Sequence, residues 1–448
     1  MPRCTIKFLF AGRRIGACLC FQILSRSVEN SMSVMIRIPL SAILIALWLV
    51  LAPRWAWAKA PLQLYVELTP PGGTLTLPPG EYSGSAHIRK PITIDGGGKA
   101  VVDGGGSGTV LYIEADNVTV RGLRIINSGR SHDQVDAGIM VTGNGNRITH
   151  NSIEDTLFGI HLSNAQDNRV ENNRIRSLST EDVTLRGDAI RLWYSHGNRI
   201  ENNDIRYSRD MVFSNSRNNQ IIGNCMSDSR ISMELVYSPG NEIRDNRLSG
   251  NFSGITVIYS DNLRIQNNRV EHMRKLTGSC ISVKESASVL IEGNEIAHCA
   301  VGLLATSPLE QEDILYISNN LFTFNDVAAF FFGEKGGHVI KGNLFVDNFV
   351  DAMGSSTATS RLNNWEGNYW DSYAGFDLDH DGIGDRPYRV FLYSDRIWME
   401  RSMARFYRGT PVLSLIDFME RLVPSSEPDL MYMDAKPLMQ PPQRQGKH

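Results

Sequence analysis

The phrase that decides the fold is Asn198-Arg199-Ile200-Glu201-Asn202-Asn203-Asp204-Ile205, because close variants of it return along the chain. In each variant an Asn precedes an Ile or Val, and a second Asn follows about five positions later. From Asn151 to Asn268 the second Asn recurs at intervals of 22, 30, 21, 22 and 22 residues. Weaker copies follow at Asn294, Asn320, Asn343 and Asn368. A period this short is typical of a solenoid.

The pattern within each period identifies the kind of solenoid. Apolar residues alternate with polar ones and most of them are β-branched, which indicates strands and not helices. Three short strands and three turns use about 22 residues, so each period predicts one coil of a parallel β-helix. We therefore expect an all-β, right-handed parallel β-helix of roughly ten to twelve coils over residues 59–370.

The recurring asparagines suit turns, because Asn tolerates left-handed backbone and its amide can bond to the same residue one coil away. We interpret most of them as structural. The 30-residue interval between Asn173 and Asn203 contains about eight extra residues within 177–187, which are expected to loop out. Solenoids often place functional residues on such insertions.

The beginning of the chain predicts export. An apolar run from Leu40 to Ala52 follows Arg37, and Ala56-Trp57-Ala58 gives a small-x-small cleavage site. Residues 1–58 are therefore interpreted as a signal peptide preceded by an extension from an early start site, and a retained membrane anchor is the alternative. The chain has 448 residues and a formal net charge of −3, so composition gives no indication of nucleic-acid binding.

Removal of that segment leaves three cysteines, Cys225, Cys280 and Cys299. An odd number leaves at least one thiol unpaired, so a disulfide framework is not expected to hold the fold. Buried packing is the interpretation for Cys225 and Cys299, and a soft-metal ligand is the alternative.

An Asp-rich loop at residues 371–390 gives the clearest metal signal. Carboxylates at alternate positions and two bending glycines resemble the start of a calcium loop, with a backbone carbonyl as a further ligand. The predicted calcium ligands are Asp377, Asp379, Asp381, Ile383 and Asp385. A charged turn without metal is the alternative.

After this loop the periodicity changes to that of helices. Residues 396–407 and 412–422 have apolar residues at three-to-four spacing, so residues 391–448 predict a helical cap that ends in a flexible, Met-containing tail. Such a cap would cover the edge of the last coil, which otherwise invites strand addition.

Three groups of motifs resemble the NosD family of periplasmic β-helix proteins, and together they span nearly the whole exported chain. They are the segment 187–195, the Tyr-Ser pairs at Tyr194, Tyr237 and Tyr259, and the segments 364–370, 377–388 and 434–439. The tryptophan-containing and Asp-rich segments, in this order, are the most specific of these.

The resemblance implies a non-enzymatic role in assembling the copper centre of nitrous oxide reductase. Its implied partners are the permease and ATPase of an ABC transporter, a copper-chaperone lipoprotein and nitrous oxide reductase itself. The protein would be periplasmic and peripheral to the inner membrane through its partner, and the region after residue 390 would be a candidate for docking to the permease. Glu234 and Val236 occupy positions where the family usually has His and Met, so copper handling here would depend on other ligands.

Histidine and methionine are the side chains that Cu(I) prefers in an exported protein. The candidates are His161, His196, Met211, Met233, Met433 and Met439. Met211 and Met233 are one period apart and could stack in adjacent coils, whereas the last two lie near the carboxyl end.

Two alternative functions remain open from the residues alone. A uronate lyase or epimerase would need a groove with charged residues, for which the candidates are Asp136, Asp188, Arg191, Arg209 and Asp210. A carbohydrate-binding module would use aromatic residues along one face, where Trp193 and Tyr194 are the candidates.

Overall fold

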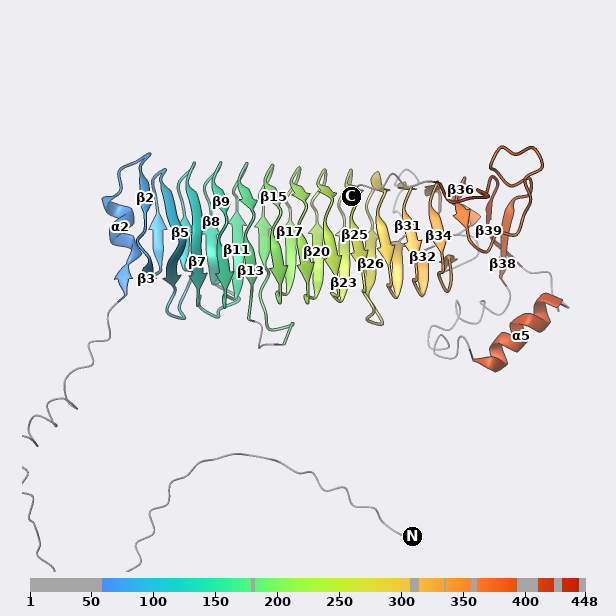
Figure 1. Cartoon of the computed structure of the whole chain (residues 1–448), viewed down its shortest axis with the longest axis horizontal. Helices are drawn as coiled ribbons and strands as arrows, with labels where there is room; N and C mark the ends of the chain where they lie inside the picture. The colour runs from blue at the N-terminus through green and yellow to red at the C-terminus, as the bar shows by residue number, and fades with distance from the viewer. Residues whose placement is uncertain are drawn as a thin grey trace, which may run out of the picture. The chain divides into compact units, whose positions relative to one another are not determined.

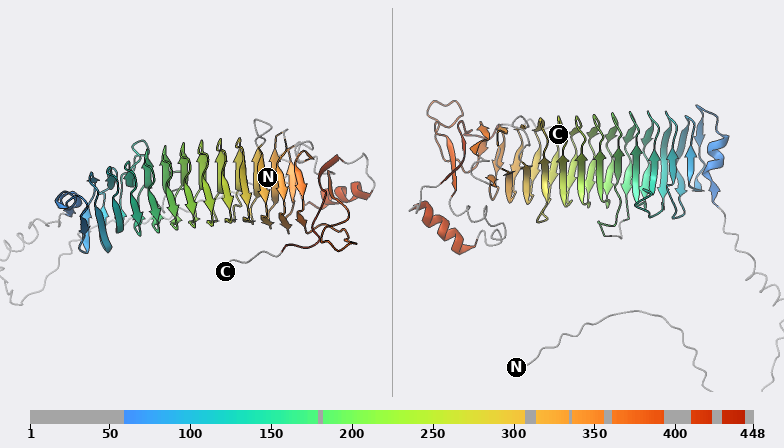
Figure 2. Two further views of the ribbon diagram at one scale, coloured as in Figure 1. Left: turned by 90° about the horizontal axis from the view of Figure 1, so that it is seen from above. Right: turned by 180° about the vertical axis from the view of Figure 1, so that it is seen from behind.

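The computed structural model describes residues 59–178, 182–306, 314–333, 336–355, 361–392, 410–422 and 429–442. It confirms the right-handed parallel β-helix, whose coils stack in one row (Figures 1 and 2). The expected signal peptide lies outside the described residues. Within the described ranges no helix is long and apolar enough to cross a membrane.

One strand of each coil belongs to a twelve-stranded parallel sheet, which we call sheet B. The solenoid has about 13 turns, close to the predicted ten to twelve. The strands of sheet B are β4 (Ala86–Ile88), β6 (Leu111–Ile113), β8 (Ala137–Val141), β11 (Phe158–Ser163), β14 (Ile190–Trp193), β17 (Asp210–Ser214), β20 (Ile231–Val236), β23 (Ser253–Ile258), β26 (Ser279–Lys284), β29 (Val301–Thr306), β32 (Val327–Phe332) and β35 (Ala352–Gly354).

The other two strands of each coil form sheet A, which has two arms joined through the long strands β5 (Thr93–Asp103) and β7 (Thr119–Ile126). The first arm also contains β2 (Thr74–Thr76), β9 (Arg147–Thr149), β12 (Arg169–Glu171), β15 (Arg199–Glu201), β18 (Gln220–Ile222), β21 (Glu242–Arg244), β24 (Arg264–Gln266), β27 (Val289–Glu292), β30 (Leu315–Ser318), β33 (Val339–Lys341) and β36 (Asn364–Glu366). The second arm contains β1 (Ala60–Pro61), β3 (Gly80–Ser83), β10 (Ser152–Glu154), β13 (Arg174–Arg176), β16 (Asp204–Arg206), β19 (Cys225–Ser227), β22 (Arg247–Ser249), β25 (Arg269–Glu271), β28 (Glu295–Ala297), β31 (Leu321–Thr323), β34 (Leu344–Val346) and β37 (Tyr369–Trp370).

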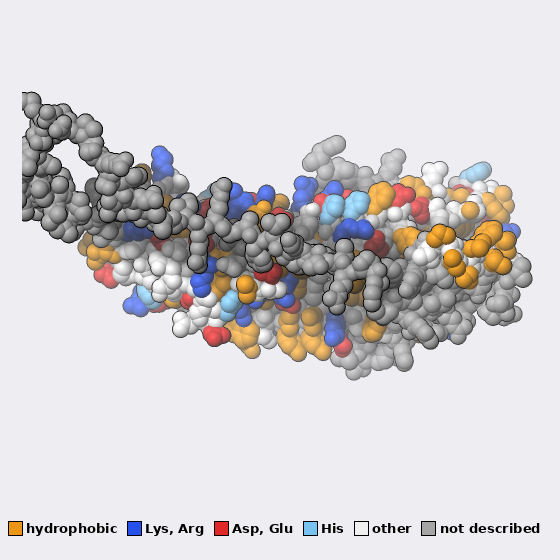
Figure 3. All heavy atoms as spheres, turned by 90° about the horizontal axis from the view of Figure 1, so that it is seen from below, with side chains coloured by type: hydrophobic (Ala, Val, Ile, Leu, Met, Phe, Trp, Pro, Cys, Tyr) orange, Lys and Arg blue, Asp and Glu red, His pale blue; other side chains and the backbone are white. Residues whose placement is uncertain are grey.

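The core runs through the middle of the coils. Inward positions of neighbouring coils hold apolar side chains in register, as in Ile148, Val170, Ile200 and Ile221, all of which are fully buried. Burial of one such side chain contributes about 1.5 to 3 kcal/mol. On the face that Figure 3 presents, acidic, basic and hydrophobic side chains are interspersed over the strands.

A buried ladder of asparagine side chains holds one corner of the coils together. In each rung a side-chain oxygen accepts hydrogen bonds from the backbone N–H and the side-chain amide of the Asn one coil earlier, as from Asn224 to Asn246 at 2.8 and 3.1 Å. The rungs are Asn151, Asn173, Asn203, Asn224, Asn246, Asn268, Asn294, Asn320, Asn343 and Asn368. The predicted structural role of the repeat is visible in these bonds.

The ladder ends on a carboxylate. Asp434 is fully buried, and its Oδ2 accepts hydrogen bonds from the backbone and side chain of Asn368, both at 2.9 Å, and from the indole of Trp370 at 3.1 Å. Its Oδ1 accepts from the backbone of Gly367 and Lys436. A carboxylate has only acceptors, so it satisfies these five donors without adding a buried donor of its own.

The solenoid is closed at both ends. Helix α2 (Leu62–Leu68) buries Leu62 and Val66 in the core at the N-terminal end. At the other end strand β39 (Asp429–Asp434) pairs with β38 (Tyr388–Leu392) in antiparallel fashion and bridges β36 through Asp434 and Trp365. Tyr432 stacks on Trp365 with ring centroids 4.8 Å apart.

The cap therefore differs from the expected helix pair. Helix α5 (Pro411–Leu422) is present, but its described side chains are exposed, and residues 396–407 lie outside the described part. Strands cover the last coil because its edge offers unpaired backbone groups, which β39 satisfies directly. Within the expected tail, residues 429–434 form strand β39.

The expected buried packing of Cys225 is wrong. Cys280 and Cys299 form a disulfide that spans 19 residues, and Cys225 is an exposed free thiol and not a packed core residue. Cys225 is the first residue of β19, where the side chain points outward like those of its neighbours Asp204 and Arg247 in register. The predicted unpaired thiol is thus Cys225.

We expect Asp434→Ala to release the C-terminal cap, because five donors lose their acceptor at a buried position. The destabilisation should be about 3 kcal/mol or more. Faster proteolysis within residues 429–442 and a red-shifted tryptophan emission would report the change. Glu366→Gln is the control, because Glu366 makes only surface ion pairs with Lys341 and Lys436. Equal behaviour of the two variants would contradict the role of Asp434.

Candidate functional site

The outer face of sheet B carries one row of side chains in strict register, which we call the outer ladder. Strand alternation sends its members outward, while the residues on either side of each member point into the core. Its members are His87, Tyr112, Met140, His161, Arg191, Val212, Glu234, Thr256, Ser282, Leu304, Phe330 and Met353. The two histidines differ in their partners, because His87 bonds to Glu114 at 2.7 Å and stacks on Tyr112.

His161 is the unusual member of the outer ladder. Its side chain is 6% exposed, and its Nδ1 is buried without a hydrogen-bond partner, as is the Nε of its ladder neighbour Arg191. The flanking members are Met140 on β8 and Arg191 on β14, each one strand away, or about 4.8 Å along the sheet. A buried polar atom without a partner is rare in a folded protein and suggests an absent ligand.

Electrostatics keep this imidazole neutral. Burial, followed by the positive charge of Arg191, lowers the pKa of His161 to about 4. The guanidinium of Arg191 lies 5.9 Å from the ring centre of Phe158 and 6.0 Å from that of Trp193. At neutral pH the ring therefore keeps a lone pair for a metal.

The pair Met140 and His161 offers a thioether and a neutral imidazole from adjacent strands. This is a soft donor set that suits Cu(I), and the rigid strands hold both Cα positions. A hard cation such as calcium would find no carboxylate among these two ligands.

Charged residues next to this pair form a chain of buried ion pairs. Asp188 accepts from Arg209 at 2.9 Å and lies 3.9 Å from Arg191, while Asp210 contacts Arg209 and Arg230. Both carboxylates are buried, and burial is the main reason that the pKa of Asp188 is raised. The chain fixes Arg191, which is the neighbour of His161.

This arrangement bears on the residues considered for an enzyme. Asp188, Arg191, Arg209 and Asp210 do come together, but the two carboxylates are enclosed and bound by arginines. Asp136 lies apart from them and accepts a hydrogen bond from Ser131 at 2.9 Å. A general base needs access to a substrate proton, and neither Asp188 nor Asp210 offers it.

Glu234, which stands where the family usually has His, is a partly buried member of the outer ladder. Burial raises its pKa, and the nearby charge of Asp210 adds to the effect. Val212 separates it from Arg191 on the ladder. The ladder also ends on a thioether, Met353, but that side chain is 1% exposed and packs in the core. The adjacent pair of soft ligands is therefore Met140 and His161, toward the N-terminal end.

The structure separates the copper candidates proposed from sequence. Met211 and Met233 are fully buried in the core, where an incoming ion has no access. His196 lies at a corner, where its Nδ1 accepts from the backbone of Arg217 at 3.2 Å. Met433 and Met439 belong to the cap: Met433 pairs with Arg389, and the backbone of Met439 donates to Gly382.

Sequence reasoning selected His161 but missed Met140. The two residues are 21 positions apart, about one coil, so the repeat itself could have paired them. Trp193 and Tyr194, proposed for carbohydrate binding, are partly exposed and contact each other edge to face. Trp193 is the last residue of β14, which pairs with the strand of His161, and Tyr194 follows it directly.

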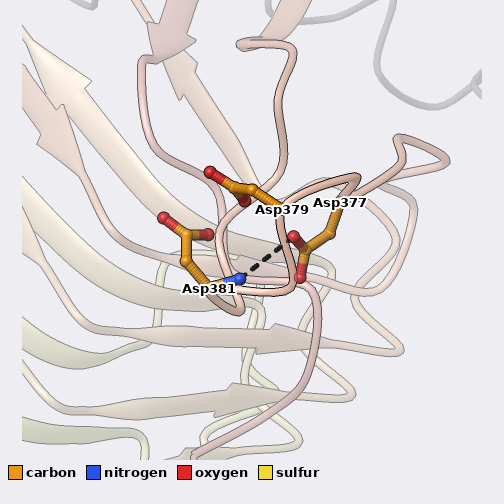
Figure 4. Close-up of side chains that lie close together, drawn as sticks. All are labelled: Asp377, Asp379 and Asp381. Atoms are coloured by element: carbon orange, nitrogen blue, oxygen red, sulfur yellow. Dashed lines mark hydrogen bonds between the residues drawn. The ribbon is translucent and has the colours of Figure 1, made fainter.

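The Asp-rich loop brings three carboxylates together, as Figure 4 shows. Oxygen atoms of Asp377, Asp379 and Asp381 lie within 4.8 Å of one another. The neighbouring charge of Asp381 is the main cause of the raised pKa of Asp379. Mutual repulsion of this kind is what a bound cation would relieve.

The other two predicted calcium ligands tie the loop to the cap. The Oδ2 of Asp385 accepts from the backbone of Leu378 at 2.7 Å, and Ile383 forms an antiparallel bridge with Leu438. The structure thus places Asp385 and Ile383 as loop anchors beside the three clustered carboxylates.

Comparison with known families gives one match over most of the solenoid. The family model described as "Periplasmic copper-binding protein (NosD)" matches residues 98–185 and 177–375. A Pseudomonas aeruginosa protein named "Probable ABC transporter binding protein NosD" is 26% identical over 423 residues, which cover 83% of this chain and 89% of that one. A Stutzerimonas stutzeri protein of the same name is 26% identical over 394 residues, covering 82% and 86%.

Two solved structures resemble this chain at low sequence identity, and the first of them, with a TM-score above 0.5, shares the architecture. The catalytic domain of a GH87 α-1,3-glucanase in complex with nigerose has a TM-score of 0.55 and 16% identity, over 69% of this chain and 68% of that one. The A-module of the mannuronan C-5 epimerase AlgE6 from Azotobacter vinelandii has a TM-score of 0.48 and 16% identity, over 63% and 87%. Identity this low shows the fold alone.

We propose that the Asp-rich loop binds calcium. Calcium should raise the melting temperature of the cap, and Asp379→Asn combined with Asp381→Asn should abolish that rise, because two of three clustered charges are removed. Differential scanning calorimetry with and without a chelator measures the effect. Asp133→Asn combined with Asp326→Asn is a charge-matched control at exposed positions outside the loop. If calcium leaves the unmodified protein unchanged, the loop is a charged turn.

Proposed function

Because the chain belongs to the NosD family of periplasmic copper-binding proteins, we propose that it is a periplasmic accessory protein that holds Cu(I) at Met140 and His161. The observation that carries this proposal is the buried, unpartnered Nδ1 of His161 beside a thioether one strand away. Copper is here a cargo and not a catalyst.

The surroundings of His161 suit a site that receives and releases a soft ion. The depressed pKa of the imidazole means that copper does not compete with a proton at neutral pH. Arg191 limits the charge that the site tolerates, which favours a monovalent ion over a divalent one. Two protein ligands leave coordination positions open for a donor or an acceptor protein.

The proposed site also offers an alternative to the missing family residues. Glu234 and Val236 replace the usual His and Met, but His161 lies on the same outer ladder as Glu234, three strands earlier. A shift along one ladder keeps the ligands on the same face of the solenoid. The same type of partner surface could then reach the metal.

We further propose that this protein works with the permease and ATPase of an ABC transporter, receives copper from a lipoprotein chaperone and serves nitrous oxide reductase. Its relatives are named as ABC transporter binding proteins. Helix α5 supplies a candidate contact, because its apolar residues Leu415, Ile416, Phe418 and Met419 are exposed. Exposed apolar clusters commonly mark interaction surfaces.

Titration with Cu(I) tests the copper site. We expect one tightly bound Cu(I), and we expect His161→Gln or Met140→Leu to weaken it by about tenfold or more, because each removes one of two ligands. Competition with a chromophoric Cu(I) chelator gives the affinity.

Matched controls are Met211→Leu and Met233→Leu in the core and His196→Gln at the corner. These should leave the Cu(I) affinity within about twofold. The copper proposal for His161 fails if its variants bind Cu(I) as tightly as the unmodified protein, or if the core variants alone weaken binding.

Association with the transporter tests helix α5. Leu415→Glu with Phe418→Glu should reduce co-purification with the permease and ATPase about tenfold or more, because charge is placed in an apolar contact. Ser414→Glu adds a charge to an exposed position on the same helix and should have little effect. Undiminished co-purification of the double variant would place the contact elsewhere.

A further inference from the structure

A pocket lies on a corner of the solenoid that the copper proposal does not use. Its two walls are residues 182–188, which precede β14, and the loop between β25 and β26, which project from the same edge in Figure 1. Residues 183 and 186 line it from the first wall, and residues 272, 274 and 275 from the second. The volume is about 580 Å³, which falls in the range of small-molecule sites.

The floor of the pocket is hollow because of one glycine. Successive coils place Tyr207, Asp228, Gly250 and His272 at the same corner, each with a positive φ of 56 to 69°. Further along, His272 stacks on His298 and fills this corner with side chains. A Cβ built on Gly250 would meet no atom within 4 Å, so the missing side chain leaves the gap.

The walls are basic. Arg186, Arg274 and Lys275 line the pocket, and Asp228 is the one carboxylate among its lining residues. The cations are held in place: Arg186 donates to the backbone oxygen of Asp228 at 3.3 Å, Arg274 pairs with Asp326 at 3.1 Å, and Lys275 lies 4.8 Å above the ring of Phe252. With Asp326 included, three cations stand against two carboxylates. The excess of positive charge favours an anion.

Aromatic and acceptor groups add a second feature. Tyr207 lines the pocket and is 38% exposed, which leaves flat apolar surface for a ring, whereas one side of the Phe252 ring is covered by Lys275. Asp228 can accept hydrogen bonds from hydroxyl groups. A cation, a flat surface and a hydroxyl acceptor together match a hydroxylated ring that bears an acid.

We propose that this pocket binds an acidic sugar, meaning a polyhydroxylated ring that carries a carboxylate or a phosphate. A uronate oligosaccharide and a sugar phosphate share this chemistry. The binding is independent of copper, because the pocket contains neither Met140 nor His161.

Isothermal titration of the purified protein tests the proposal with four probes: trigalacturonate, glucose 6-phosphate, maltotriose and inorganic phosphate. Saturable binding of either acidic sugar, at least about tenfold tighter than maltotriose and phosphate, supports it. The tighter of the two acidic probes identifies the source. Equal binding of inorganic phosphate, equal binding of maltotriose, or no binding of any probe overturns it.

Two variants locate the binding. Gly250→Phe fills the hollow with an aromatic residue that the corner accepts elsewhere, since Phe324 has a φ of 54°. Lys275→Gln removes one wall cation, and Lys99→Gln is the control at an exposed position outside the pocket. Both pocket variants should weaken the acidic probe about tenfold, with Lys99→Gln unchanged. Undiminished binding in Gly250→Phe, or tighter binding of an acidic peptide such as tetra-aspartate, overturns the assignment.

Discussion

The asparagine ladder is the interaction on which the rest of the structure depends. Each buried amide uses its oxygen to accept two hydrogen bonds from the coil before it, and its N–H groups to donate, so consecutive coils share one register. One such bond contributes about 0.5 to 1.5 kcal/mol, and leaving its buried partner unsatisfied costs more. Where the ladder has not begun, β5 and β7 pass the corner as long strands.

Because the asparagine ladder fixes the register of the coils, the two faces of each strand have different requirements. Inward positions must be apolar and of matching size, because a coil buries them completely. Outward positions are free to vary, and the outer ladder uses this freedom to place Met140, His161 and Arg191 side by side. The same scaffold carries sugar-cleaving sites in other proteins, such as the GH87 glucanase, so the fold does not decide the chemistry.

Buried charge connects the scaffold with the proposed copper site. Asp188 and Asp210 would be costly to bury alone, and the arginines around them compensate that cost without adding much net stability. The ion pair with Asp188 keeps Arg191 beside His161. Together with burial, the positive charge of Arg191 lowers the pKa of His161, so the imidazole stays neutral. The proposed acidic-sugar pocket lies at the corner that contains Gly250. Two longer loops form its walls there, and the missing side chain of Gly250 leaves its floor open.

The sequence by itself determined the β-helix, its approximate number of coils and the structural role of the asparagines, because a repeat of about 22 residues with strand alternation has few other solutions. It also put forward His161 and the Asp-rich loop as candidates, and both remain proposals. Only the tertiary structure decided which candidates face outward: Met211 and Met233 are core, Cys225 is exposed, and Met140 joins His161. The direction of a side chain depends on a shift of one residue along a strand, which composition and spacing leave open. The strand cap and its buried Asp434 also required the structure, since pairing across 66 residues from Asn368 is a contact that no local pattern specifies.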